Sequence, residues 1–163
     1  MLRTDEQYED MARTAYRELG LEQTKNPDLL TVITKLKTRY PGFNYKRVRD
    51  AELPEAYAQW DSDAKLILIR ESVFREMQAG VPRARMTVWE EIAHMLLGHR
   101  GVLNRSTAKT IAEQVVLRVR AQEAEAKRFA AILAAPSFQV PEGATSDYLA
   151  DVHGLSQQAA AIR

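Results

Sequence analysis

The chain contains no cysteine and only three histidines among its 163 residues. Without thiols it has neither a disulfide framework nor a thiolate metal site, so histidine and carboxylate side chains are the ligands left for any metal. A charge excess of one sign is also lacking, because 23 basic and 22 acidic residues leave a formal net charge of +1. That balance gives no electrostatic reason to expect direct contact with nucleic acid.

Long apolar segments are absent as well. No stretch approaches the ~20 apolar residues that a membrane helix needs. The first ten residues, MLRTDEQYED, lack the apolar core of a signal peptide. We therefore expect a cytoplasmic protein that makes no contact with a membrane.

The composition is that of a folded globular protein, since 45% of the residues are hydrophobic and 28% are charged. We expect a single domain over 1–163, with a helical N-terminal extension (1–40), a core (41–136) and a helical tail (145–163). Apolar residues recur at helical spacing in most of the chain and alternate with polar residues only in its middle.

These patterns predict the α+β fold class, with a small antiparallel sheet of three short strands joined by tight connections. The expected helices cover 4–20, 28–40, 71–78, 83–98, 107–135 and two short segments on either side of Gly154, and the expected strands cover 43–48, 56–60 and 66–69.

The segment that carries chemistry is MTVWEEIAHMLLGH, at 86–99. Residues three or four apart share a helix face, so Glu90, Glu91 and His94 project together beside apolar neighbours. Such a cluster is costly unless its members are paired, protonated or bound to a cation. A zinc peptidase helix reads H-E-x-x-H, with two metal-binding histidines and a glutamate that acts as the base. Here Glu90 replaces the first histidine, and the pattern alone is also typical of an ordinary helix with a solvated acid pair.

Two motifs together resemble the ImmA/IrrE family of metallopeptidases. The first is RMTVWEEIAH at 85–94, with Gly98 and His99 after it, where the family carries R-F-T-x-A-H-E-x-G-H. The second is EAEAKRFAAILAAP at 123–136, which matches the family's E-x-E-A-x-x-F-A-x-x-L-L-x-P helix. The resemblance covers roughly residues 40–163. It implies a zincin-like fold in which an active-site helix and a ligand helix line one cleft.

Carried across by position, the resemblance makes Glu91 the catalytic base, His94 the second metal ligand and Glu125 the third. The departures are Glu90 in place of the first histidine and Trp89 in place of a residue that is usually small. In one reading of this altered site, Glu90, His94 and Glu125 bind zinc, manganese or iron while Glu91 positions a water.

Two other readings stay open. In one there is no tight metal site, and a protonated His94 between Glu90 and Glu125 takes the place of the metal while the cleft grips a partner without cutting it. In the other, His99 is a substitute metal ligand. On an ideal helix His99 points away from His94, but a helix end at Gly98 would swing it inward.

Members of the family typically cleave a helix-turn-helix repressor encoded nearby in bacteria or phages. The resemblance therefore implies a regulator of transcription that acts on a protein partner, such as a helix-turn-helix repressor. Our preferred hypothesis is a pseudopeptidase that binds this partner. The alternative is an active metallopeptidase with a metal at Glu90, His94 and Glu125. The isolated His153 is expected at the surface.

Overall fold

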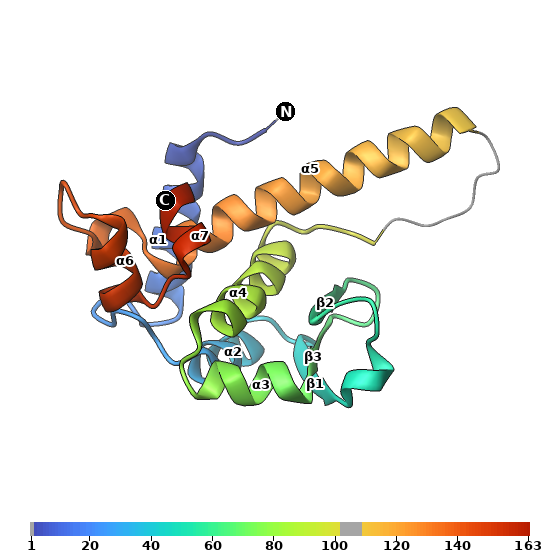
Figure 1. The fold of residues 1–163 in the computed structure, drawn as a ribbon, viewed down its shortest axis with the longest axis horizontal. Coiled ribbons are helices and arrows are strands. Elements are labelled where there is room, and N and C mark those ends of the chain that lie inside the picture. The colour runs from blue at the N-terminus through green and yellow to red at the C-terminus, as the bar shows by residue number, and fades with distance from the viewer. Residues whose placement is uncertain (1, 102–108) are drawn as a thin grey trace.

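The computed structural model describes residues 2–101 and 109–163, and it confirms the α+β class (Figure 1). The elements are α1 (Asp5–Glu18), α2 (Leu29–Arg39), β1 (Asn44–Val48), the 3-10 helix η1 (Asp50–Glu52), β2 (Ala58–Asp61), β3 (Leu66–Arg70), α3 (Glu71–Gln78), α4 (Pro82–Leu96), α5 (Lys109–Ala134), the 3-10 helix η2 (Ser137–Gln139), α6 (Ser146–His153) and α7 (Gln157–Ile162).

Both N-terminal helices begin where the sequence supplies a cap. The Thr4 side chain accepts a hydrogen bond from the Gln7 amide, and the Thr4 amide donates to the Gln7 side chain, which forms a capping box at α1. The Asp28 side chain accepts from the Thr31 amide and caps α2. The two helices predicted ahead of the sheet are thereby confirmed.

The sheet has the strand order β1-β3-β2, with β3 in the middle. β2 and β3 form an antiparallel hairpin in which Trp60 pairs with Ile67, whereas β1 runs parallel to β3. The prediction of an antiparallel sheet is therefore wrong for β1. The physical reason is the connection over 49–57, which includes η1 and is no tight turn. This long connection carries the chain past the position next to β1, which β3 then occupies. A tight turn would have paired β1 directly with β2.

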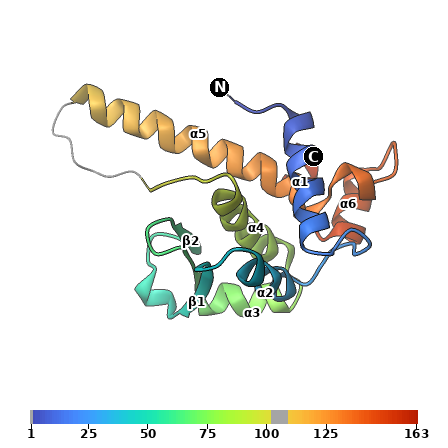
Figure 2. The ribbon, with the colours of Figure 1, turned by 180° about the vertical axis from the view of Figure 1, so that it is seen from behind.

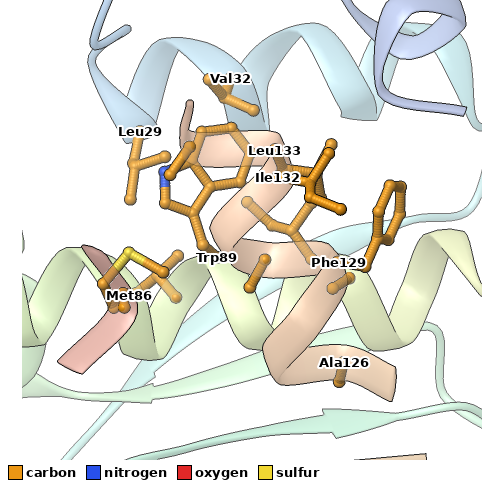
Figure 3. Packing of buried hydrophobic residues seen from close by; sticks show 14 of the residues in the cluster. Leu29, Val32, Met86, Trp89, Ala126, Phe129, Ile132 and Leu133 are labelled. Carbon is orange, nitrogen blue, oxygen red and sulfur yellow. The ribbon is translucent and has the colours of Figure 1, made fainter. Parts of the chain in front are cut away.

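The core lies where α4 packs against α5, with α2 across them. Figure 3 shows the indole of Trp89 pointing from α4 towards Leu29 and Val32 of α2, with Leu133 of α5 beside it. All four side chains are buried. Trp89, at a position where the resembled family has a small residue, thus joins three helices. It also fixes the rotation of α4 about its own axis.

Helix α5 is buried at one end and exposed at the other. Phe129 and Ile132 near its C-terminal end are fully buried, whereas Val116 is 49% exposed and Val119 is 38% exposed. In Figures 1 and 2 the N-terminal half of α5 extends from the helical body on the side where the sheet lies. The helix predicted over 107–135 is confirmed for 109–134, and positions 107 and 108 lie outside the described residues.

The two helices predicted around Gly154 are confirmed as α6 and α7. Gly154 has a φ of +69°, and a Cβ there would lie 2.8 Å from Oδ1 of Asn26, so both the conformation and the space require glycine. The turn at Gly154 folds α7 back towards α5 and covers the end of α6. His153 is only 1% exposed as a result, so the expectation of a surface histidine is wrong.

Among the described residues, no helix is both long enough and apolar enough to cross a lipid bilayer.

Candidate functional site

The polar face of α4 supplies the first part of the site. Val88, Trp89 and Ile92 are buried in the core, which leaves one rotation for the helix. Glu91 and His94 then face β2 and α5, where both make polar contacts. The helical spacing in the sequence predicts that these two side chains share a face, and the core packing of α4 decides where that face points.

The C-terminal end of α4 brings in a second imidazole. Gly98 has a φ of +68°, its amide donates to the Met95 carbonyl at 3.1 Å, and the His99 amide donates to the His94 carbonyl at 3.0 Å. This pair of bonds is a Schellman motif, which ends the helix and turns the chain back. The ring of His99 thereby returns to His94, and their Nδ1 atoms lie 2.8 Å apart.

Two carboxylates of α5 extend this pair into a row of four side chains. Oε1 of Glu123 lies 3.2 Å from Nε2 of His94, and Oε2 of Glu125 lies 3.0 Å from Nε2 of His99. All four imidazole nitrogens therefore have a partner. The row runs Glu123, His94, His99, Glu125 and joins the end of α4 to the middle of α5.

The partners decide where the protons are. Nε2 of His99 faces a carboxylate and donates to it, so its Nδ1 must accept from Nδ1 of His94. Nε2 of His94 faces Glu123 and also donates, which makes His94 the imidazolium. Burial alone would lower the pKa of His94, but the Glu123 bond and the negative charges of Glu91, Glu123 and Glu90 raise it above the ordinary value. Burial, helped by the charge of His94, lowers the pKa of His99 against the pull of Glu125.

Glu125 is held in place from the N-terminal side. Its Oε1 accepts from the Tyr8 hydroxyl at 3.1 Å and lies 3.3 Å from the Arg3 guanidinium. Burial would raise the pKa of Glu125, but the bonds from His99 and Tyr8 and the nearby positive charges lower it. Burial and the bond to Glu125 raise the pKa of Tyr8 to about 12. Glu125 is thus an ionised structural link between α1, α5 and the turn after α4.

Glu91 is bonded to the sheet. Its Oε2 accepts a hydrogen bond from the Trp60 amide at 2.6 Å, and the Trp60 indole donates to the His99 carbonyl at 3.1 Å. Burial raises the pKa of Glu91 to about 7, although the charge of His94 and the Trp60 bond oppose the shift. Trp60 in this way links β2 both to Glu91 of α4 and to the turn that follows α4.

A hollow of about 400 Å³ opens beside these groups. Ala58 and Trp60 of β2 form one wall, Val119 of α5 forms another, and Glu91 and His94 lie between them. The hollow has the mixed polar and apolar lining of a site that holds a ligand in a defined orientation.

The residues predicted for a metal triad do not come together in this hollow. His94 and His99 are adjacent, and Glu125 reaches them through His99. Glu90 lines a different hollow, with Tyr57 and Lys127. Burial raises the pKa of Glu90 against the attraction of Lys127.

Within residues 2–101 and 109–163, no three histidine, aspartate or glutamate side chains are grouped so that they could hold a metal ion. The imidazole nitrogens, which would be the natural zinc ligands, face each other and two carboxylates. In this arrangement the donor set does not fit a metal held by Glu90, His94 and Glu125.

Two residues of the site were missed from the sequence. Glu123 stands two positions before Glu125 in the second motif, and only the rotation of α5 decides which of them meets His94. Trp60 gave no signal beyond that of a strand residue, because its amide bonds Glu91 and its indole bonds the His99 carbonyl, and both partners are distant in the sequence.

Comparisons of this chain with family models, with curated proteins and with solved structures found no match.

Proposed function

We propose that this chain is a regulatory protein on a zincin-like scaffold, which binds an extended segment of a protein partner between β2 and α5 and does not cut it. The partner we expect is a helix-turn-helix repressor, as the resemblance to the ImmA/IrrE family implies. One observation carries the proposal. The ring nitrogens of His94 and His99 contact each other and two glutamates, next to the outer edge of β2, which pairs with no strand among the described residues.

The outer edge of β2 supports peptide binding. The Arg70 amide donates to the Tyr57 carbonyl, so alternate residues of β2 bond to β3, and those between, Ala58 and Trp60, direct their backbone groups outwards. Among the described residues no strand pairs with this edge. Glu91 holds the Trp60 amide. The backbone of Ala58 and the Trp60 carbonyl are left for a peptide that adds as a further strand.

The histidine pair supports binding without cleavage. Peptide hydrolysis needs a base that takes a proton from water and a group that stabilises the oxyanion. Here the Glu91 carboxylate is bonded to the Trp60 amide, and the charge of His94 is paired with Glu123. These bonds make the groups part of the framework that joins α4, α5 and β2, so we assign them to holding the shape of the hollow.

An active peptidase is the second candidate, and Glu91 is the observation that favours it. A carboxyl group with a pKa of about 7 suits a general base at neutral pH, and Glu91 lines the same hollow as the β2 edge.

The two candidates separate on the fate of the partner. The purified chain is mixed with the helix-turn-helix repressor encoded beside it, binding is measured by calorimetry, and the mass of the repressor is measured before and after. We expect binding, an intact repressor, and unchanged binding by Glu91→Gln. A repressor that is cut by the natural chain and left whole by Glu91→Gln would overturn the proposal in favour of the peptidase.

The site of binding is tested by a matched pair of substitutions on α5. Val119 lines the hollow, whereas Val116 is exposed on the same helix and does not line it. A long cation at 119 obstructs the groove, so we expect Val119→Arg to weaken binding by about tenfold, the equivalent of about 1.4 kcal/mol. Val116→Arg should bind like the natural chain, and equal losses in the two variants would place the partner elsewhere.

A further inference from the structure

A second hollow, of about 280 Å³, lies next to the first. Glu90 and Met86 of α4, Lys127 of α5, Ile162 of α7 and Tyr57, which precedes β2, contribute to its lining. Of the residues in this lining, the resemblance gives a role only to Glu90, as the residue at the position of the first metal ligand, and it assigns no role to α7.

The two hollows share their three walls. Along α4 the lining passes from His94 to Glu90, and along α5 it passes from Glu123 to Lys127, which in each case is one helical turn. Along the third wall it passes from Ala58 to the adjacent Tyr57. The hollows therefore follow one another along α4, and we infer that they form one groove.

The groove has a defined length. From His94 to Arg83, both lining residues, α4 rises by about 17 Å at 1.5 Å per residue. An extended chain covers that distance with about five residues at 3.3 Å each. A peptide that pairs with β2 in the first hollow is thus long enough, over a few residues, to place a side chain in the second.

Exposed apolar side chains gather along this groove. Val119 lines the first hollow, and Tyr57 and Ile162 line the second, although all three are open to solvent. Large apolar residues that are exposed together in this way are typical of a protein-binding surface.

The chemistry of the second hollow is that of a receptor for a long cation. Met86 and Ile162 offer apolar contact, and the half-buried Glu90 supplies a carboxylate. Its nearest charges include Lys127 and His94, but in the part of the chain that the structure describes neither forms an ion pair with it, since His94 is paired with Glu123. A half-buried carboxylate without a partner is stabilised by a donor that comes from outside.

The two cations of this hollow do not fill that role. Arg83 is exposed and lies over the Tyr57 ring at 5.2 Å, with its Nη2 3.3 Å from the Tyr57 hydroxyl. Lys127 is exposed on α5, and its long chain is free to turn towards solvent. Both cations therefore lie at the solvent-exposed rim of the hollow, whereas Glu90 is more deeply buried in it.

The wall formed by α7 is fastened to the rest of the molecule. Arg128 donates to the Ile162 carbonyl, Arg163 donates to the Ala135 carbonyl at 2.7 Å, and Arg163 also pairs with Glu9. The second hollow is therefore a preformed part of the surface, which lowers the ordering cost of binding.

We propose that the partner segment bound along β2 continues through both hollows, and that Glu90 receives a lysine or arginine side chain of that segment. The inference rests on the proposed function, because it names the partner chemistry of the same groove. Glu90, at the position of the missing histidine, is in this account a residue that selects the partner.

A random heptapeptide library displayed on phage tests this directly. Selection on the immobilised natural chain should enrich sequences with lysine or arginine at one fixed position. Selection on Glu90→Gln should enrich sequences without that preference, while Glu113→Gln, an exposed acid of α5 outside both hollows, should keep it. Enriched sequences that are the same for Glu90→Gln would overturn the inference and leave peptide binding intact. No enrichment on any of the three would overturn the proposed function itself.

The strength of the contact is then measured on one selected peptide. Calorimetry should show that Glu90→Gln weakens binding by about 10- to 100-fold, the range for a hydrogen bond between charged groups. Replacing the cation of the peptide by alanine should weaken binding to the natural chain equally and should not weaken binding to Glu90→Gln further. Independent, additive losses would show that the cation binds elsewhere. Lys127→Met removes a positive charge at the rim that would repel the cation of the peptide, so this variant should bind the same peptide more tightly.

Discussion

The molecule buries histidine in two places that differ in what surrounds the ring. His94 and His99, between α4 and α5, have a partner for each ring nitrogen. His153, at the end of α6, is more deeply buried, and neither of its ring nitrogens makes a hydrogen bond among the described residues. Burial lowers the pKa in all three cases, yet only His94 ends above its ordinary value.

The difference lies in the charges nearby. Glu123, Glu91 and Glu90 surround His94. Next to His153 are the positive charges of Lys25 and Arg163, which add to the effect of burial, and the Ala134 carbonyl opposes them without making a well-formed hydrogen bond. One place is therefore built to hold a charge and the other to exclude it. The burial of a histidine therefore does not by itself show whether its surroundings stabilise the charged or the neutral ring.

The two regions should differ most in stability when the same permanent cation is placed in both. We expect His153→Lys to lower the free energy of unfolding by about 3–5 kcal/mol, the cost of an unpaired buried charge. His94→Lys keeps a cation beside Glu91 and Glu123, so its cost should be smaller by about 2 kcal/mol or more. Urea unfolding of both variants at pH 7.5 measures the difference. Equal costs would mean that the charge at position 94 is not stabilised by its neighbours.

The two regions should also respond to pH in opposite directions. The unfolded chain takes up a proton on His153 near pH 6.5, whereas burial lowers its pKa in the native state. Below that pH the unfolded state binds more protons, so His153 lowers the free energy of unfolding as the pH falls, by up to about 1.4 kcal/mol at pH 5.5. For His94, whose pKa is raised on folding, the sign is opposite, because its stabilisation is complete below pH 6.5 and is lost as the pH rises through the native pKa.

His153→Leu isolates the first of these effects. Because leucine does not titrate, the variant should gain stability relative to the natural chain between pH 7.5 and 5.5, by up to about 1.4 kcal/mol. Urea unfolding at the two pH values measures the gain. A constant difference between the two proteins would show that His153 is not the source of acid sensitivity.

A pair of glycine substitutions tests whether the turn at Gly98 holds the two histidines together. Gly98 and Gly143 have φ angles of +68° and +77°, and a Cβ at either one meets no other atom within 4 Å. Alanine at either position should lower the free energy of unfolding by about 1 kcal/mol, because both residues have a left-handed backbone conformation. Only Gly98→Ala should also change the pKa of His94, measured by NMR titration of its ring protons. The account fails here if both variants leave that titration unchanged.

The smallest expected effect is on one ion pair. Glu123→Gln replaces the carboxylate next to His94 by a neutral group, so the pKa of His94 should fall, with little change in thermal stability because Glu123 is half exposed. The matched variant is Glu113→Gln, on an exposed part of the same helix, which should leave the titration of His94 as it is. NMR titration of both variants makes the measurement. A His94 that keeps its raised pKa in Glu123→Gln would assign the shift to Glu91 and Glu90.

The helices and the positions of the three strands were largely predictable from the sequence, and the direction of β1 was not. Thr4, Asp28 and Gly154 are local signals whose meaning depends on the nearest few residues. The pairing of β1 with β3 depends on whether the chain over 49–57 leaves room for another strand. That is a tertiary property, and the alternation of polar and apolar residues carries no trace of it.

The site was predictable only in part for a similar reason. The spacing of Glu90, Glu91 and His94 placed them on one side of α4. Which of the two glutamates faces β2 is decided by the packing of Trp89 against α2, and the approach of His99 depends on the turn at Gly98. Residue types and spacing predict the set of groups, and packing in three dimensions selects among them.

We expect hydrogen bonds to Glu123 and Glu125, without a bound metal, to hold His94 and His99 together. This expectation is tested most directly by the metal content of the protein, purified without chelator or a nickel column and measured by mass spectrometry. We expect only trace zinc, manganese and iron in folded protein, in the natural chain and in His94→Gln alike. Near-stoichiometric metal that is lost in His94→Gln would contradict it and make the peptidase the better reading.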